Sequence, residues 1–132
     1  MSRENVEGYR QAVDAFNRRD RAAFLAWCDP ELENVPSRYW PESESIRGRE
    51  AVWDFLVGVN EPWEESRFEC FELMDAGTDK VVADLRSEMR GKASGAGVAW
   101  RFWQVITFRN DGKALRFRMV QRPSRSARSR RD

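Results

Sequence analysis

The chain has 132 residues, of which 34% are charged and 41% hydrophobic, and its formal net charge at pH 7 is +1. This length fits one domain, which can bury a core without disulfides or metal ions. The last eleven residues, from Arg122, contain five arginines and one aspartate, which leaves residues 1–121 at −3. An acidic body argues against nucleic acid as a partner, because phosphate binding normally requires a basic patch on the fold.

The composition excludes several kinds of site. The sequence contains no histidine, and so lacks both the commonest zinc ligand and the one side chain that titrates unaided near neutrality. Cys28 and Cys70 have no metal-ligand spacing, and we interpret them as buried thiols of a reducing cytoplasm. No apolar run is long enough to span a membrane, and residues 1–10 lack the apolar segment of a signal peptide. We therefore expect a cytoplasmic protein without a metal, a cofactor or a membrane contact.

Three helices are predicted in the first half of the chain. Residues 4–18 repeat apolar side chains at spacings of three and four, which indicates an amphipathic helix. Asp20 is placed to cap a second, shorter helix, which Pro30 ends because proline cannot continue the hydrogen-bond ladder. A short strand is predicted at residues 31–35, and residues 49–59 form a third helix with one apolar stripe.

The second half of the chain predicts strands at residues 67–75, 80–90, 98–109 and 114–121. The last two are joined by Asn110-Asp111-Gly112, and Asp-Gly between two apolar runs is a strong hairpin signal. Helices followed by an antiparallel meander indicate an α+β domain over residues 1–121. Residues 122–132 are rich in Arg and Ser, and we expect them to be a disordered tail.

Several local phrases occur in an order typical of one family. They are Val13 to Asp20, Cys28 to Glu31, Arg47 to Val52 and the hairpin from Val105 to Arg116. Residues 4–121 thus resemble the SnoaL-like proteins of the nuclear transport factor 2-like superfamily, which includes ketosteroid isomerases, polyketide cyclases and epoxide hydrolases. The resemblance implies a cone-shaped fold. In it, three N-terminal helices pack on a strongly curved, mostly antiparallel sheet around a small-molecule pocket.

Strand alternation divides residues 98–109 between two faces, and on the family's fold one of these faces the pocket. Gln104 is the polar exception on that face. Burying its amide without a partner would cost roughly 1–3 kcal/mol, so it either points into a wet pocket or ties down a loop carbonyl. With the apolar side chains around it, the resemblance implies the following ligand-binding residues: Phe16, Trp27, Tyr39, Phe55, Trp100, Phe102, Gln104, Phe117 and Met119.

The proton-carrying positions of the related isomerases hold other residues here. Gln104 stands near the place of a neutral acid, and Asn34 or Val35 takes the place of the base. The place of the tyrosine falls near Ala12, so that Tyr9 lies one turn too early. A glutamine donates hydrogen bonds but does not exchange protons. Gln104 is therefore the one catalytic candidate, and the isomerase acid–base set is interpreted as absent.

Other charged residues leave an enzymatic alternative open. Asp84, Arg86 and Arg101 are of the types used by the related epoxide hydrolases, but alternation places them on the convex face as a charge ladder. Glu33 and Glu72 reach the cavity mouth only if the strand register shifts by one residue. The favoured function is therefore binding of a hydrophobic small molecule. The alternative is a polyketide cyclase-like or ketosteroid isomerase-like enzyme with an acid at an unexpected strand position.

The convex face of the predicted sheet also carries apolar residues. Trp103 and Val105 lie there, although the open face of an antiparallel sheet is usually polar. Related proteins often dimerise by pressing two such faces together, so we expect a homodimer with Trp103 near its centre. The alternative is that the long stems of Arg101, Arg116 and Arg118 shield the indole.

Overall fold

The structure is a computed structural model that describes residues 2–36, 44–60, 63–91 and 96–121. The predicted tail, residues 122–132, and Tyr39 lie outside this part, and so does the side chain of Trp100. The described residues form helices α1 (Ser2–Asn17), α2 (Arg21–Trp27) and α3 (Arg49–Asn60). Their strands are β1 (Cys28–Val35), β2 (Ile46–Arg47), β3 (Trp63–Asp75), β4 (Lys80–Gly91), β5 (Gly97–Phe108) and β6 (Ala114–Gln121).

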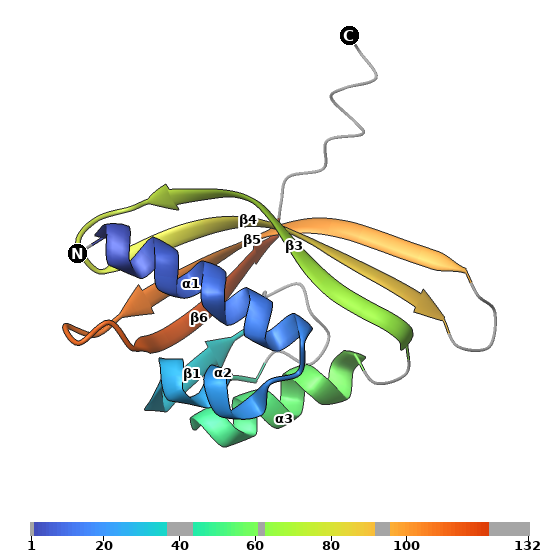
Figure 1. The fold of residues 1–132 in the computed structure, drawn as a ribbon, viewed down its shortest axis with the longest axis horizontal. Coiled ribbons are helices and arrows are strands. Elements are labelled where there is room, and N and C mark those ends of the chain that lie inside the picture. The colour runs from blue at the N-terminus through green and yellow to red at the C-terminus, as the bar shows by residue number, and fades with distance from the viewer. Residues whose placement is uncertain (1, 37–43, 61–62, 92–95, 122–132) are drawn as a thin grey trace, which may run out of the picture.

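These strands form one sheet in the order β2-β1-β6-β5-β4-β3. Every neighbouring pair is antiparallel except β1 and β6, which run parallel. Figure 1 shows α1 running across one face of the curved sheet, with α2 and α3 beside β1. The predicted α+β architecture, with three helices on a mostly antiparallel sheet, is confirmed.

Two strands begin three or more residues earlier than predicted. β1 starts at Cys28, so Pro30 lies inside a strand rather than ending a helix. The pairing of β1 with β6 is irregular between Cys28 and Glu33, which is where a residue without an N–H group is tolerated. β3 starts at Trp63, because the backbone at this residue pairs with the end of β4 at Gly91, and the next three residues, Glu64, Glu65 and Ser66, are polar. Apolar alternation gives no signal for such a polar extension.

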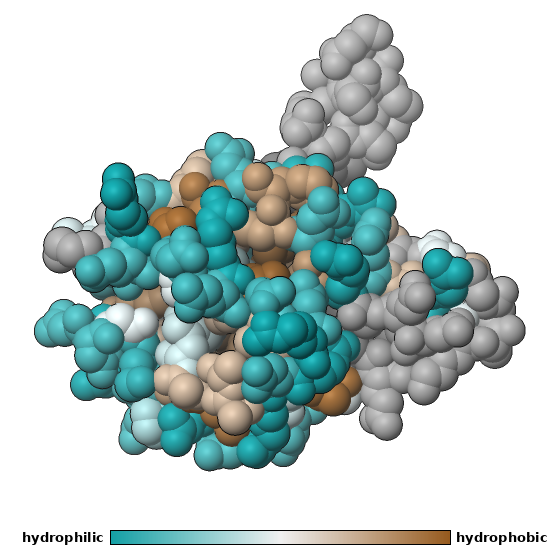
Figure 2. All heavy atoms as spheres, in the orientation of Figure 1, coloured by the Kyte–Doolittle hydropathy of each residue, from teal (hydrophilic) through white to brown (hydrophobic). Residues whose placement is uncertain are grey.

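The core lies between the helices and the concave face of the sheet. In β4, Val81, Ala83, Leu85 and Met89 are all buried, as the alternation predicts. The face in Figure 2 is covered mainly by hydrophilic residues, and hydrophobic residues emerge only in separate areas. In the described part of the chain, no helix combines the length and apolar character needed to cross a membrane.

Candidate ligand-binding cavity

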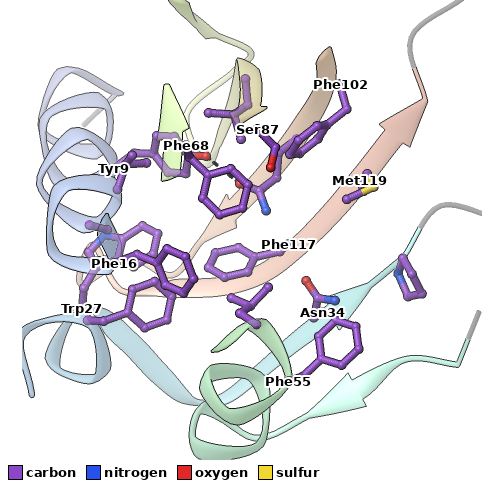
Figure 3. Close-up of a pocket in the computed structure, with 17 residues that line it drawn as sticks. Tyr9, Phe16, Trp27, Asn34, Phe55, Phe68, Ser87, Phe102, Phe117 and Met119 are labelled. Carbon is purple, nitrogen blue, oxygen red and sulfur yellow. Dashed lines mark hydrogen bonds between the residues drawn. The ribbon is translucent and has the colours of Figure 1, made fainter. Parts of the chain in front are cut away.

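A cavity of about 120 Å³ lies between the three helices and the concave face of the sheet (Figure 3). Most of its wall is aromatic or aliphatic. The structure places most of the predicted ligand-binding residues on this wall, while Tyr39 and the Trp100 side chain fall outside the described part. The predicted residues that line the cavity are Phe16, Trp27, Phe55, Phe102, Gln104, Phe117 and Met119.

Tyr9 also lies on the cavity wall, although it is not among the predicted ligand-binding residues. Its hydroxyl donates a hydrogen bond to Gln104 Oε1 at 2.6 Å, which Figure 3 marks as a dashed line. A position one turn before the place of the isomerase tyrosine therefore does not keep the hydroxyl of Tyr9 away from Gln104. Spacing along a helix gives the position of a residue on that helix, but not the angle at which the helix crosses a sheet.

Hydrogen bonds at both ends stabilise the short helix α2, which carries Trp27. At its start, Asp20 Oδ1 accepts from the backbone N–H three residues later, at 3.2 Å, so the predicted cap is present. At its end, Lys113 Nζ donates to Ala26 O at 2.8 Å, and Arg49 donates to another carbonyl of the last turn at 3.1 Å. These bonds satisfy helix-end groups and fix the position of Trp27.

Trp27 closes one end of the cavity. Its ring stacks on Phe117, with centroids 5.7 Å apart, and is tilted against Tyr9 at 6.0 Å. Its Nε1 is buried without a hydrogen-bond partner in the described part of the chain. This atom lies beside Gly8 of α1, where a Cβ would come within 3.3 Å of it. The absence of a side chain at Gly8 lets the indole approach the helix closely.

Asn17 attaches the end of α1 to the edge strand β3. Its side-chain Nδ2 donates to Phe68 O and its Oδ1 accepts from Phe68 N, both at 2.9 Å. The amide thus pairs with β3 as a neighbouring strand would. The ring of Phe68 is thereby held on the cavity wall, edge-on to Phe102 at 6.1 Å between centroids. Phe68 was not among the predicted site residues.

The polar groups on the cavity wall are all uncharged. They come from Tyr9, Asn34, Ser87 and Gln104, and no charged side chain is among the described residues that line the cavity. Figure 3 shows Asn34 and Ser87 on opposite sides of the cavity, each among apolar neighbours. Burial raises the pKa of the Tyr9 hydroxyl well above its ordinary value of 10.0, with a smaller contribution from Cys70. Tyr9 is therefore a neutral donor at physiological pH.

Glu33 and Glu72, which would reach the cavity mouth only after a shift of the strand register, do not line the cavity. Glu33 forms ion pairs with Arg116 at 3.4 Å and Arg47 at 3.7 Å, and Glu72 is exposed. No cluster of three or more potential metal ligands occurs among the residues that the structure describes. The cavity wall, as described, can hold and orient a molecule, but it presents no carboxylate to move a proton.

The cysteines add no reactive thiolate. Cys28 is buried and Cys70 half-buried, and neither is in a disulfide. Burial raises the pKa of the Cys28 thiol to about 12, although the nearby charges of Arg49 and Lys113 oppose this shift. Burial also raises the pKa of Cys70. Both side chains are therefore protonated near neutral pH, and only the thiolate form is strongly nucleophilic.

The candidate hydrolase residues lie away from the cavity. Arg101 Nη2 is 2.7 Å from Asp84 Oδ2, and its guanidinium lies 4.3 Å from the centroid of the Phe71 ring. Asp84 pairs across the sheet with Trp103, which in turn pairs with Val120. These residues belong to the convex face, as the sequence predicted, and none of them lines the cavity.

The sequence model of the SnoaL-like domain matches residues 9–117, which include both the helices and the sheet that form the cavity. The chain belongs to the SnoaL-like family. No curated protein matches this SnoaL-like domain. The predicted family resemblance is therefore confirmed, and among the described residues that line the cavity the match covers all except Met119.

Solved structures share the fold of this SnoaL-like domain. An NTF2-like protein of unknown function from Burkholderia pseudomallei is 23% identical, with a TM-score of 0.76 and 97% of each chain covered. TerC, co-crystallised with polyporic acid, is 22% identical, with a TM-score of 0.75 and 96% of each chain covered. RV0760c from Mycobacterium tuberculosis, in complex with estradiol-17beta-hemisuccinate, is 16% identical, with a TM-score of 0.76 and coverage of 90% of this chain and 94% of that one. At these identities the likeness establishes the fold alone.

Proposed function

We propose that this domain binds an uncharged, hydrophobic small molecule in the cavity beneath Gln104. The observation that carries the proposal is the cavity wall, where aromatic and aliphatic side chains surround a few neutral hydrogen-bonding groups. Such a composition is typical of pockets that hold a ligand by apolar contact and orient it with a small number of polar groups. The complexes of TerC with polyporic acid and of RV0760c with an estradiol derivative support the capacity of this fold to hold ring compounds.

The size of the cavity favours a ligand of about one ring. Its volume of about 120 Å³ is close to that of an engineered cavity of about 150 Å³ that binds benzene. It is well below the roughly 300–1,000 Å³ of pockets that enclose drug-sized ligands. Phe16, Phe24 and Trp27 occupy one end of the cone, which limits the space left for a ligand.

The described cavity wall has no charged side chain, which favours a neutral ligand and argues against the enzymatic alternative. An ion loses its hydration on entering an apolar cavity, and this costs several kcal/mol unless a partner charge compensates. The described wall offers no such partner. Acid–base catalysis of the isomerase or cyclase kind requires a proton-carrying group next to the substrate, and Gln104 cannot supply one.

Thermal unfolding with two matched probes tests the proposal. Toluene at ten times its Kd should stabilise the folded chain by about 1.4 kcal/mol, which raises the Tm by several degrees. Benzoate should leave the Tm unchanged. Ala12→Leu, which fills part of the cavity, should abolish the toluene effect, whereas the exposed control Ala22→Leu should preserve it. An equal response of both variants to toluene would place binding elsewhere.

We propose further that the domain is a homodimer through its convex face. Trp103 and Val105 are half-buried there, and the ring of Phe71, which is 45% accessible, lies 4.3 Å from the guanidinium of Arg101. A two-fold dimer would cover this apolar centre, while Arg101 and Asp84 flank it on each copy. The unpaired cysteines also support a reducing compartment such as the cytoplasm as the location of the protein.

A further inference from the structure

We infer that Tyr9 fixes the orientation of the Gln104 side-chain amide, so that the amide N–H group is left for the ligand. The cavity then selects neutral ring molecules that bear a hydrogen-bond acceptor. This inference rests on the proposed function, because it names which hydrophobic molecules the cavity prefers. Tyr9 acts here through Gln104 and is a positioning residue.

The orientation of the amide follows from the distance to Tyr9. A glutamine side chain presents an oxygen acceptor and a nitrogen donor of nearly equal shape, so its orientation is set by its partners. The Tyr9 Oη and Gln104 Oε1 atoms are 2.6 Å apart. This separation fits an O–H···O bond, whereas N–H···O bonds are usually about 2.7–3.2 Å long. The hydroxyl of Tyr9 therefore donates to the oxygen of the amide.

The nitrogen of the same amide is left for a ligand. Gln104 lines the cavity, and no described residue accepts a hydrogen bond from its Nε2. Because Oε1 is already occupied, the free hydrogen-bonding capacity of Gln104 is mainly that of a donor. An unpaired donor at an apolar site favours a ligand that carries an acceptor, such as a carbonyl or nitrile group, over one of the same shape without it.

The hydroxyl of Tyr9 is the reason why Gln104 prefers hydrogen-bond acceptors to donors. If its hydroxyl were absent, Oε1 would lose its partner and the amide could turn either end toward the ligand. The preference for acceptors would then weaken, while the apolar wall and its affinity for a plain ring would remain. A purely structural role for Tyr9 would instead change the affinity for both kinds of ligand together.

Benzonitrile and phenylacetylene form a suitable pair of probes. They have nearly the same shape, but only benzonitrile carries a good acceptor, and its nitrile stretch reports hydrogen bonding directly. The wild-type chain should bind benzonitrile about three- to tenfold more tightly than phenylacetylene, which corresponds to one net hydrogen bond. The nitrile stretch should also shift on binding.

Three variants locate the donor. Gln104→Leu should bind both probes with equal affinity and show no shift of the nitrile stretch. Tyr9→Phe should reduce the preference while retaining its affinity for phenylacetylene. Gln11→Ala, at an exposed position of α1 that does not line the cavity, is the control and should keep the full preference.

The outcomes separate this inference from the proposed function. Equal affinity of the wild-type chain for the two probes would overturn the inference and leave the proposed function intact. A preference that survives in Gln104→Leu, or that disappears in the control Gln11→Ala, would also overturn it. If neither probe binds the wild-type chain, the proposed function fails as well.

Discussion

Tyr9 shows how a single buried side chain connects the fold to the chemistry of the cavity. It is 3% exposed, and its ring packs against Trp27 while its hydroxyl reaches Gln104. Because burial raises its pKa, the folded chain holds the phenolic proton more tightly than the unfolded chain does. The stability that Tyr9 contributes is therefore complete below pH 10, the ordinary value, and is lost as the pH rises toward the raised value.

This behaviour predicts an abnormal titration. The chain contains two tyrosines, so a Tyr39→Phe background leaves Tyr9 as the only phenol. Folded protein should show no phenolate absorbance at pH 10, whereas protein unfolded in urea should be about half ionised there. Between pH 10 and 11, the wild-type chain should also lose more stability than Tyr9→Phe. Normal titration of the folded chain would show that Tyr9 is not enclosed as described.

Strand alternation was sufficient to predict much of the cavity wall. The periodicity of the last two strands predicts the places of Phe102, Gln104, Phe117 and Met119 on this wall, once the family's fold identifies the inner face. The same periodicity in β4 could have added Ser87, which follows Leu85 by two residues. Tyr9 could not be found in this way, because its position depends on how α1 crosses the sheet. Phe68 lies on the cavity wall because it pairs with Ser87 across β3 and β4, and strand alternation alone does not give this register.

At the scale of elements, the types of the helices and long strands were predictable and their polar ends were not. Apolar periodicity indicated α1, α3, β4 and β5, since each buries one face. The two-residue strand β2 carries too few residues to show a period. It exists because its backbone pairs with β1 at Asn34 and Glu33, a contact that is distant in sequence.

The attachment of α1 to β3 gives an element-scale prediction. Asn17→Ala removes both hydrogen bonds to the backbone of Phe68, and should lower the free energy of unfolding by about 1–3 kcal/mol. Urea unfolding measures the loss, and faster hydrogen exchange at the Phe68 amide would locate it. Gln11→Ala, at an exposed position of the same helix, is the control and should stay within about 0.5 kcal/mol of wild type. If the two variants are equally stable, Asn17 does not hold the strand.

At the scale of the whole molecule, we propose a different role for each face of the sheet, which is ligand binding for the concave face and dimerisation for the convex face. The concave face and the helices enclose the cavity, and the convex face carries Trp103 and Val105 among charged residues. We expect sedimentation to show a dimer for the wild-type chain and a monomer for Trp103→Glu, because a carboxylate would be buried at the interface. Gln11→Glu adds the same charge on the helical side and should remain dimeric. A monomeric wild-type chain would contradict the proposed interface.

The central claim is that the cavity beneath Gln104 is a binding site for a neutral ring compound. A crystal of the full chain soaked with benzonitrile tests it most directly. The ring is predicted to lie between Phe102 and Phe117, with the nitrile nitrogen about 2.9–3.0 Å from Gln104 Nε2. A well-ordered cavity that stays empty or holds only water, at a concentration that saturates binding in solution, would contradict the claim.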